Sequence, residues 1–361
     1  MSKPDRLSLG IRQKNMPKNL KTSLVSIIMP TLNSGRAIEH SLKSIKGQTY
    51  PQEKIEILVV DGGSTDDTAK IAQNYRARII PNPYTMPEHA KQIGLKLAKG
   101  KYAMFLDSDE VLRNPSSIQN KVRLLEDNPA CKNIVTTGLI SPRNFPFICN
   151  YINRYGDPFS YFIHRIDGGN YYGSLRKRFF VEKHGRDYEI IKFKKSDLLP
   201  IVDGGGHFFD LSYLKSIENV EKNILSATVF TSMCSRTQRL GVMKGDYVVH
   251  HSAPNIKTYL RKIKWRIVSN LSVKGVNIPG YRSREKFLAK GLRLKKYLFI
   301  PYALLIFPAL IDSMLLSVKH QDLRFFVHLP LSVYTAVEII IQTLRISILR
   351  MTVRAGSYGQ T

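Results

Sequence analysis

Tyr102-Ala103-Met104-Phe105-Leu106-Asp107-Ser108-Asp109 is a short apolar run that ends abruptly in two carboxylates. Such a run is typical of a buried strand that leaves a sheet at a polar turn. Similar apolar runs occupy residues 24–29, 55–60 and 77–80. The segments between them carry apolar residues at helical spacing. This alternation of strand and helix predicts an α/β fold, with a mostly parallel sheet flanked by helices on both faces.

Polar residues directly follow three of the predicted strands, at positions 31–33, 61–64 and 107–109. Ligands of parallel sheets bind beyond the carboxyl ends of the strands. We therefore expect these three segments to lie together and to form a binding site.

Asp107 and Asp109 place two carboxylates on one tight turn at this edge. Oxygen ligands of this kind suit Mg²⁺ or Mn²⁺ and leave coordination positions for substrate phosphates. A bound ion would stabilise a departing diphosphate. Taken alone, however, an Asp-X-Asp tripeptide is better explained as an acidic turn that caps the next helix.

The tripeptide does not stand alone. Residues 25–33, 59–68 and 100–109, in this order and at this spacing, resemble the nucleotide-sugar-binding half of the family 2 glycosyltransferases. The resemblance is specific over residues 24–112 and looser to about residue 268. It implies the GT-A fold, which is Rossmann-like, and a nucleotide-sugar donor.

The same resemblance implies roles for individual residues. The donor would be bound by residues at the three strand ends and on the helix before the third: Pro30, Thr31, Asn33, Asp61, Gly62, Ser64, Lys91, Asp107 and Ser108. Asp61 would contact the base, and Lys91 would face the diphosphate. Asp107 and Asp109 would serve catalysis by holding the divalent metal. Many members have a second Asp where this chain has Gly62, which leaves the base of the donor open.

A late segment, Asp246-Tyr247-Val248-Val249-His250-His251, resembles the strand that delivers a histidine towards the diphosphate and the metal in this family. His250 would then be a third metal ligand beside Asp107 and Asp109, because a neutral imidazole is a good ligand. The alternative is a histidine pair that merely closes a strand.

The general base that removes the acceptor's proton is missing from its usual place. Counting back from Gly241 through Arg236 puts Val229 and Phe230 at the positions where inverting members carry an acidic pair. Asp210 or another nearby acid could serve from a shifted loop, or the protein could be inactive. A third hypothesis is that the acceptor is a lipid phosphate, which is already ionised and needs only positive charge to hold it.

The chain of 361 residues carries a formal charge of +27, which predicts an anionic partner. Thirteen Lys and Arg residues against Glu285 alone are concentrated between residues 257 and 296. This block lacks the interleaved aromatic residues of a nucleic-acid platform, so nucleic acid is not an expected partner. The three cysteines form no pair, which favours a reducing compartment and argues against a structural zinc site.

Two apolar stretches, residues 297–318 and 325–349, follow the basic block. Each is long enough to cross a bilayer, although Asp312 and Glu338 would be costly in lipid. Buried core helices are the alternative. The adjacent basic block favours a cell membrane carrying anionic lipids, with the catalytic part on the cytoplasmic side. The stretches could span the bilayer or lie in its interface.

Residues 261–265, Arg-Lys-Ile-Lys-Trp, resemble the (Q/R)xxRW signature of membrane-associated, cellulose-synthase-like members, with Lys264 in place of Arg. The resemblance implies that Lys264 and Trp265 lie near the acceptor. An amphipathic interfacial helix explains the segment equally well.

The predicted organisation is a basic arm (1–22), a GT-A domain (23–256), a basic interfacial segment (257–296), two hydrophobic helices (297–350) and a tail (351–361). We expect a metal-dependent inverting glycosyltransferase that moves a sugar to a lipid-linked acceptor such as a polyprenyl phosphate. A transferase acting on a soluble or polymeric glycan and an inactive nucleotide-sugar-binding module are the alternatives.

Overall fold

The computed structural model describes residues 22–194, 197, 202, 205–217, 229–272, 285 and 293–348. The predicted arm, except for its last residue, and the predicted tail therefore lie outside the described residues. The same holds for most of the predicted basic interfacial segment beyond residue 272.

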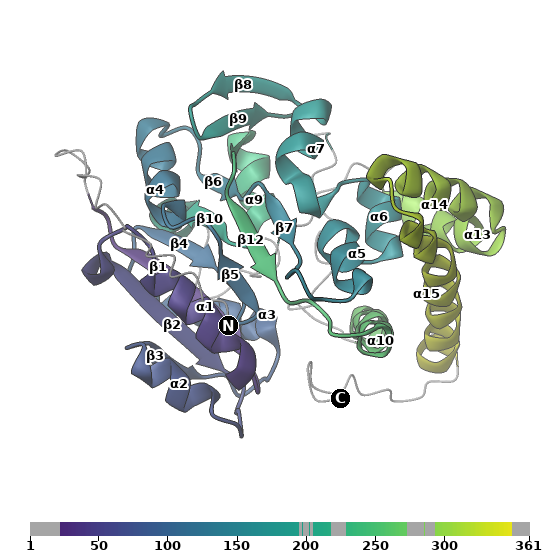
Figure 1. Ribbon diagram of the computed structural model, residues 1–361, viewed down its shortest axis with the longest axis horizontal. Helices are drawn as coiled ribbons and strands as arrows, with labels where there is room; N and C mark the ends of the chain where they lie inside the picture. Colours follow the sequence, from purple (N-terminus) through teal and green to yellow (C-terminus); the bar gives the residue numbers. More distant parts are fainter. Residues whose placement is uncertain are drawn as a thin grey trace, which may run out of the picture.

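The first hundred described residues alternate strand and helix as predicted (Figure 1). The elements are β1 (Val25–Thr31), α1 (Gly35–Lys46), a 3₁₀ turn (Gln52–Lys54), β2 (Ile55–Asp61), α2 (Thr68–Asn74), β3 (Arg78–Pro81), α3 (Pro87–Leu97) and β4 (Tyr102–Phe105). Strands β3, β2, β1 and β4 are neighbours in this order and all run parallel. The register pairs Thr31 with Asp61, so the polar ends of β1 and β2 meet at one edge. The predicted α/β fold is confirmed.

The sheet continues beyond β4 with strands of mixed direction. Its order is β3-β2-β1-β4-β10-β6-β11-β9-β8, and a second sheet has the order β5-β12-β7. The added strands are β5 (Glu110–Leu112), β6 (Asn133–Val135), β7 (Gly138–Ile140), β8 (Phe180–His184), β9 (Tyr188–Lys192), β10 (His207–Asp210), β11 (Arg239–Met243) and β12 (Tyr247–His250). Strand β12 matters most for the site, because its antiparallel pairing with β5 sets His250 opposite Glu110.

Helices cover both faces of the large sheet. Helices α1, α2 and α4 (Ser117–Asp127) contribute buried apolar side chains to the core on one face. Helices α3, α8 (Leu211–Ile217) and α9 (Val229–Thr237) do so on the other. Gly94 of α3 packs directly on Ile28 of β1, where a larger side chain would clash. This close approach brings the helix that carries Lys91 against the sheet.

The remaining helices form a group to one side of the sheets, except for α7, which packs against β11 of the large sheet (Figure 1). They are α5 (Phe147–Tyr155), α6 (Pro158–His164), a 3₁₀ turn (Gly168–Asn170), α7 (Tyr171–Arg178), α10 (Ile256–Ser272), η5 (Lys295–Leu298), α13 (Phe299–Leu304), α14 (Phe307–His320), η6 (Leu323–Val327), α15 (His328–Thr343) and a π turn (Leu344–Ile348). Helix α15 packs against α6, α10, α13 and α14. From here on, "the tail" means the segment from residue 293 to residue 348, and not the predicted tail at residues 351–361.

Length and composition single out one helical segment of the described chain as able to cross a membrane, Leu323–Ile346. A second candidate consists of Lys295–Leu304 and Phe307–His320 taken together, but these two pieces are bent by 89°. By itself this finding is weak evidence, because a buried core helix passes the same test.

Asp312, the acid that would be costly in lipid in the first apolar stretch, faces protein. Its Oδ1 lies 2.5 Å from Nη1 of Arg165, the residue that ends α6. Its Oδ2 accepts a 2.6 Å hydrogen bond from the hydroxyl of Tyr302 on α13. That hydroxyl is also 2.8 Å from His328 Nε2, and His328 Nδ1 is 2.6 Å from the Tyr151 hydroxyl of α5. This polar network fixes three tail helices to α5 and α6.

The network predicts an acid-sensitive stability. The pKa of His328 is lowered to about 4, chiefly by burial; the charge of Asp312 opposes this shift and that of Arg165 adds to it. The ring faces Tyr151, Tyr302 and the edge of Tyr161. The unfolded chain takes up this proton near pH 6.5, so the stability that neutral His328 contributes is complete above that pH. It is lost as the pH falls towards 4.

We expect the wild type to lose about 2.5 kcal/mol more unfolding free energy between pH 7 and pH 4.5 than His328→Gln, which cannot titrate. Urea unfolding at the two pH values measures both proteins. Equal losses in the two proteins would contradict the prediction.

Candidate active site

The ends of β1 and β2 form one hydrogen-bonded unit. Asp61 is its centre: Oδ1 accepts from the hydroxyls of Thr31 (3.1 Å) and Ser64 (2.5 Å), and Oδ2 accepts from the backbone amides of Gly63 and Ser64. The Gly62 amide donates to the carbonyl of Thr31 at 2.8 Å. The loop after β2 is therefore folded against the end of β1.

Asn33 completes this unit in a left-handed conformation, with φ of 49°. Asparagine tolerates this region better than most residues. The Asn33 amide donates to the Ser64 hydroxyl at 2.8 Å, and its side-chain oxygen accepts from the Thr65 amide at 2.9 Å. Pro30 lies in β1 just before Thr31. The structure thus brings together all six predicted donor residues of the first two strand ends.

The end of β4 joins the same edge. The Nζ of Lys91, buried on α3, lies 2.8 Å from Asp107 Oδ1. The Ser108 hydroxyl donates to the hydroxyl of Ser34, just beyond β1, at 2.9 Å. All nine predicted donor residues therefore lie at the carboxyl ends of three adjacent parallel strands or on the helix beside them.

Asp109 and His250 form an ion pair across the two sheets. His250 Nε2 is 3.5 Å from Asp109 Oδ2, and the amide of His251 donates to the Asp109 carbonyl at 3.0 Å. Burial alone would lower the pKa of His250, but the Asp109 carboxylate outweighs this effect and raises the pKa to about 9. Burial alone would raise the pKa of Asp109, but the charge of His250 outweighs this effect and lowers the pKa to about 2.

Glu110 is a site residue that the sequence analysis missed. It is buried, and its two oxygens accept hydrogen bonds from the amides of Gly205 (2.7 Å) and Asp107 (3.0 Å). Burial, and then the charge of Asp107, raise the pKa of Glu110 to about 7. Gly205 has φ of +67°, a conformation that favours glycine. The glycine run at residues 204–206 was the only signal in the sequence for this contact.

A cavity of about 900 Å³ opens from this edge towards the tail. Lys91, Asp107, Glu110 and His250 line one end of it. The remaining wall is largely apolar and comes mainly from α5, α6, α10, η5, α13 and α15: Ile152, Tyr155, Phe159, Ile263, Trp265, Ile267, Leu271, Tyr297, Phe299, Ile300 and Ile339 are among its residues. The polar edge of the sheet and the apolar tail thus border one space.

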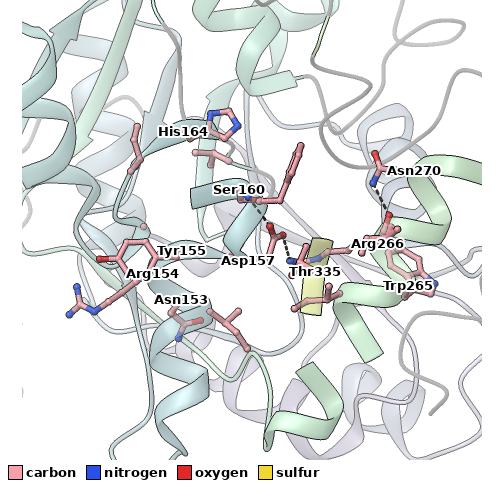
Figure 2. A pocket seen from close by; sticks show the side chains of 18 of the residues that line it. Asn153, Arg154, Tyr155, Asp157, Ser160, His164, Trp265, Arg266, Asn270 and Thr335 are labelled. Carbon is pink, nitrogen blue, oxygen red and sulfur yellow. Dashed lines mark hydrogen bonds and ion pairs between the residues drawn. The ribbon is translucent and has the colours of Figure 1, made fainter. Parts of the chain in front are cut away.

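A polar pair crosses this cavity between α6 and α10 (Figure 2). Asp157 caps α6 by accepting from the Ser160 amide at 2.7 Å, and its other oxygen lies 3.1 Å from Nη1 of Arg266. The Asn270 side chain donates to the Arg266 carbonyl. Asp157 is therefore held in an ion pair and as a helix cap, and not left as an isolated acid.

The family model for glycosyl transferase family 2 matches residues 26–217, which is more than half of the chain. The chain belongs to this family. The match covers the strand ends described above, including Asp61, Lys91, Asp107 and Asp109.

Curated relatives of this family 2 member align with less than a third of its length. Poly(ribitol-phosphate) beta-N-acetylglucosaminyltransferase TarS of Staphylococcus aureus is 29% identical over 109 residues, which cover 28% of this chain and 19% of TarS. Uncharacterized glycosyltransferase RP339 of Rickettsia prowazekii is 36% identical over 115 residues, which cover 30% of this chain and 34% of the relative. The chain therefore spans only a minor part of the length of these relatives.

Solved structures of similar fold include S. aureus TarS and a mannosyltransferase, PcManGT, from Pyrobaculum calidifontis. TarS has a TM-score of 0.46 at 17% identity, covering 90% of this chain and 54% of that one. PcManGT, solved with GDP-Man and Mn²⁺, has a TM-score of 0.48 at 15% identity, covering 89% and 87%.

The predicted metal ligands of this family 2 member are only partly assembled. Asp109 and His250 are adjacent, and Nδ1 of His250 is a buried nitrogen without a hydrogen bond. Asp107 instead pairs with Lys91. Within the described part of the chain, no three His, Cys, Asp or Glu side chains are grouped so that they could hold a metal ion. Asp109 and His250 still have the right chemistry for a divalent ion whose other ligands are donor oxygens.

The structure does not bring Asp210 to the site. Strand β10 runs antiparallel to β4 and pairs Asp210 with Tyr102, at the end of β4 opposite to Asp107. Asp210 instead pairs with Lys132 at 2.8 Å and caps α8 through the Tyr213 amide. Asp210 ends β10, and because β10 runs antiparallel to β4, that end lies at the start of β4 and away from the site.

Val229 and Phe230, at the usual positions of the acidic pair, are buried in the core. Of the two predicted acceptor residues, Trp265 lines the cavity, whereas Lys264 is exposed and does not. The two side chains leave α10 in different directions, so only Trp265 is placed to touch a molecule bound there.

Proposed function

We propose that this protein is a metal-dependent inverting glycosyltransferase that moves a sugar from a nucleoside-diphosphate donor to a lipid-linked acceptor such as a polyprenyl phosphate. It would act at the cell membrane with its catalytic part on the cytoplasmic side. The single observation that carries the proposal is the cavity, which joins Asp107, Glu110 and His250 to an apolar wall built by α10, α13 and α15.

The donor half of the proposal rests on the strand ends. Asp61, Asn33 and Ser64 form a rigid polar rim where a nucleoside would bind, and Lys91 stands beside Asp107 where a diphosphate would carry negative charge. Family membership supports these assignments, because the family model covers this part of the chain.

Asp109 and His250 would hold the metal, together with oxygens of the donor. A divalent ion supplies charge that stabilises the departing diphosphate. His250 would have to give up its proton to act as a ligand, since only neutral imidazole has a free lone pair on the nitrogen.

The buried Val229 and Phe230 favour an acceptor that needs no general base. A phosphate oxygen of the acceptor is already ionised near pH 7. It would attack the anomeric carbon and form a new carbon–oxygen bond as the bond from that carbon to the diphosphate breaks on the opposite face. Lys91, Arg266 and Lys296 line the cavity, each paired there with an acid (Asp107, Asp157 and Glu285), and the phosphate would compete with these carboxylates for the three cations.

A polymeric acceptor is the second candidate, because the name of TarS describes a transferase that acts on poly(ribitol-phosphate). A poly(polyol-phosphate) chain shares the phosphate with a lipid-linked acceptor and lacks the hydrocarbon. The apolar wall of the cavity favours the lipid.

Incubating the protein in detergent with labelled nucleotide-sugars and a polyprenyl phosphate should yield a labelled lipid that partitions into organic solvent. Ile339→Trp, which fills the cavity from α15, should lower kcat/KM for this acceptor at least about tenfold while donor affinity by calorimetry stays the same. Ile256→Trp, the same substitution at an exposed site outside the cavity wall, is the matched control and should change neither.

Transfer to a soluble polymer but not to the lipid would overturn the proposal in favour of the second candidate. Donor binding without any transfer or donor hydrolysis would favour the inactive module.

A further inference from the structure

Exposed apolar side chains are concentrated in the tail. Sixteen of the nineteen large hydrophobic side chains that are exposed in the described chain lie between Leu294 and Leu344, and the other three are Tyr84, Phe180 and Ile256. Patches of this size on a soluble surface mark an interaction site. The tail therefore has a partner that covers it.

Helix α14 indicates what kind of partner this is, because large apolar side chains face outward and polar side chains face the protein. Its outward face carries Phe307, Ile311, Met314, Leu315 and Val318, of which Phe307 keeps 67% and Val318 76% of its surface exposed. These positions recur at helical spacing on one side. A helix on the surface of a soluble protein would place polar residues there.

The buried side of α14 carries the polar residues instead. Asp312, Ser313 and Ser317 are buried, and the two serine hydroxyls donate to backbone carbonyls one turn earlier at 2.8 Å. Hydroxyls satisfied within their own helix need no water. Helix α15 follows the same rule: His328, Ser332, Thr335 and Gln342 are buried, whereas Val337 and Ile341 are exposed.

The geometry of the tail excludes a simple span by its first apolar stretch. Helices α13 and α14 have 6 and 14 residues, against the roughly 20 that a bilayer requires. The chain turns by 89° between them, at Leu305 and Ile306. Asp312 in the middle of α14 is paired with Arg165 at the end of α6, so this helix cannot leave the protein surface without depriving a buried carboxylate of its partner.

Positive charge borders the exposed apolar face. Lys319, Arg324 and Arg345 are exposed. Burial lowers the pKa of Lys295, and the nearby charges of Arg165 and Arg178 lower it further. The described tail holds six Lys and Arg residues against Asp312, Asp322 and Glu338. Both aspartates are paired with arginine, and Lys296, Lys319 and Arg324 are themselves paired with Glu285, Asp167 and Asp322. Such a border suits anionic lipid headgroups.

We propose that the outward face of α13, α14 and α15 inserts into one leaflet of an anionic bilayer. Helix α15 lies in a segment long enough to span, Leu323–Ile346, but it packs against α6, α10, α13 and α14, so that the tail lies in the interface and does not cross the membrane. This inference rests on the membrane location proposed above and adds the face, the depth and the orientation. Helices α13 and α15 also line the cavity, with Phe299 and Ile339, and η5 adds Tyr297, so the cavity borders two of the three inserted helices. Figure 1 shows this group of helices at the side of the molecule away from β3.

Vesicle binding without any donor or acceptor tests the face separately from the proposed reaction. The wild type should sediment with phosphatidylcholine vesicles containing phosphatidylglycerol, and Leu315→Glu combined with Val318→Glu should weaken this binding at least about tenfold. Both side chains are exposed, so the variant should keep its melting temperature. Phe180→Glu, at an exposed site on β8, is the matched control and should bind like the wild type.

The depth is tested with single cysteines, because the three native cysteines are buried. Gln321, exposed between α14 and η6, would be at the far tip of a membrane-spanning hairpin. In sealed vesicles with the catalytic part outside, a membrane-impermeant thiol reagent should label Gln321→Cys as readily as Arg186→Cys on the β8–β9 turn. Labelling of Gln321→Cys only after lysis would overturn the inference and leave the proposed reaction standing.

Two results of the vesicle experiment would also overturn the inference. One is wild-type binding that the Leu315→Glu, Val318→Glu variant retains. The other is a wild type that ignores vesicles and forms a dimer in solution that this variant dissociates, since the face would then be covered by a second copy of the chain.

Discussion

Asp109→Asn should lower the rate of sugar transfer by about 10³-fold or more, which corresponds to roughly 4 kcal/mol of transition-state stabilisation. The substitution keeps the size of the side chain and removes its charge. That charge lies 3.5 Å from His250 and is the part of the site best suited to fix a divalent ion against the departing diphosphate. Release of nucleoside diphosphate, followed with and without Mn²⁺, measures the effect.

The matched control is Asp187→Asn. Asp187 also sits in an ion pair, with Arg123 at 2.6 Å, and its side chain is 32% exposed against 31% for Asp109. Its replacement should leave transfer and the Mn²⁺ response unchanged. If Asp109→Asn retained the metal-dependent signal, the assignment of the site would be wrong. Equal melting temperatures of the two variants would show that lost activity is not lost folding.

Lys121→Met should lower the unfolding free energy by about 3–5 kcal/mol. Lys121 on α4 is fully buried, and its Nζ lies 2.5 Å from Oδ2 of the equally buried Asp246. Ser117 also donates to that oxygen at 3.0 Å. Removing the lysine leaves the carboxylate buried without its counter-charge, which is far more costly than losing an exposed pair. Urea unfolding measures the loss.

Arg123→Met on the same helix is the control, since it removes a partly exposed ion pair and should cost less than about 1 kcal/mol. Adding Asp246→Asn to Lys121→Met should restore part of the stability, because the uncompensated charge is then gone. Similar losses in Lys121→Met and Arg123→Met would contradict the prediction. Since Asp246 directly precedes β12, a shift there would also move His250.

The donor side of the site was predictable because it depends on local pattern. Each apolar run ends in polar residues, and the parallel order of β1, β2 and β4 is what such an alternation favours. Thr31, Asp61 and Asp107 therefore meet at one edge, as the sequence analysis expected. Placing His250 beside Asp109 required the resemblance as well, because residues 110–249 of the chain separate them.

The rest depends on strand direction and on distant contacts, which one sequence does not reveal. Asp210 was a reasonable candidate until β10 proved to run antiparallel, which carries it to the far end of β4. The acid of the first apolar stretch, Asp312, acquires its partner Arg165 only through the packing of α14 on α6. Glu110 belongs to no recognisable pattern, and its partner amide comes from Gly205.

The Arg165–Asp312 pair has a practical consequence for handling this enzyme. A membrane anchor joined by a loose linker can be cut off to give a soluble catalyst. Here the tail, which we propose as the anchor, is held to α6 by this ion pair, and residues of its inner face line the cavity. Deleting residues after 292 would strip that wall and lay bare the apolar side chains of α5 and α6 that pack on it. The proposed membrane location then requires that purification keep the tail in place and supply a detergent or lipid for its outer face.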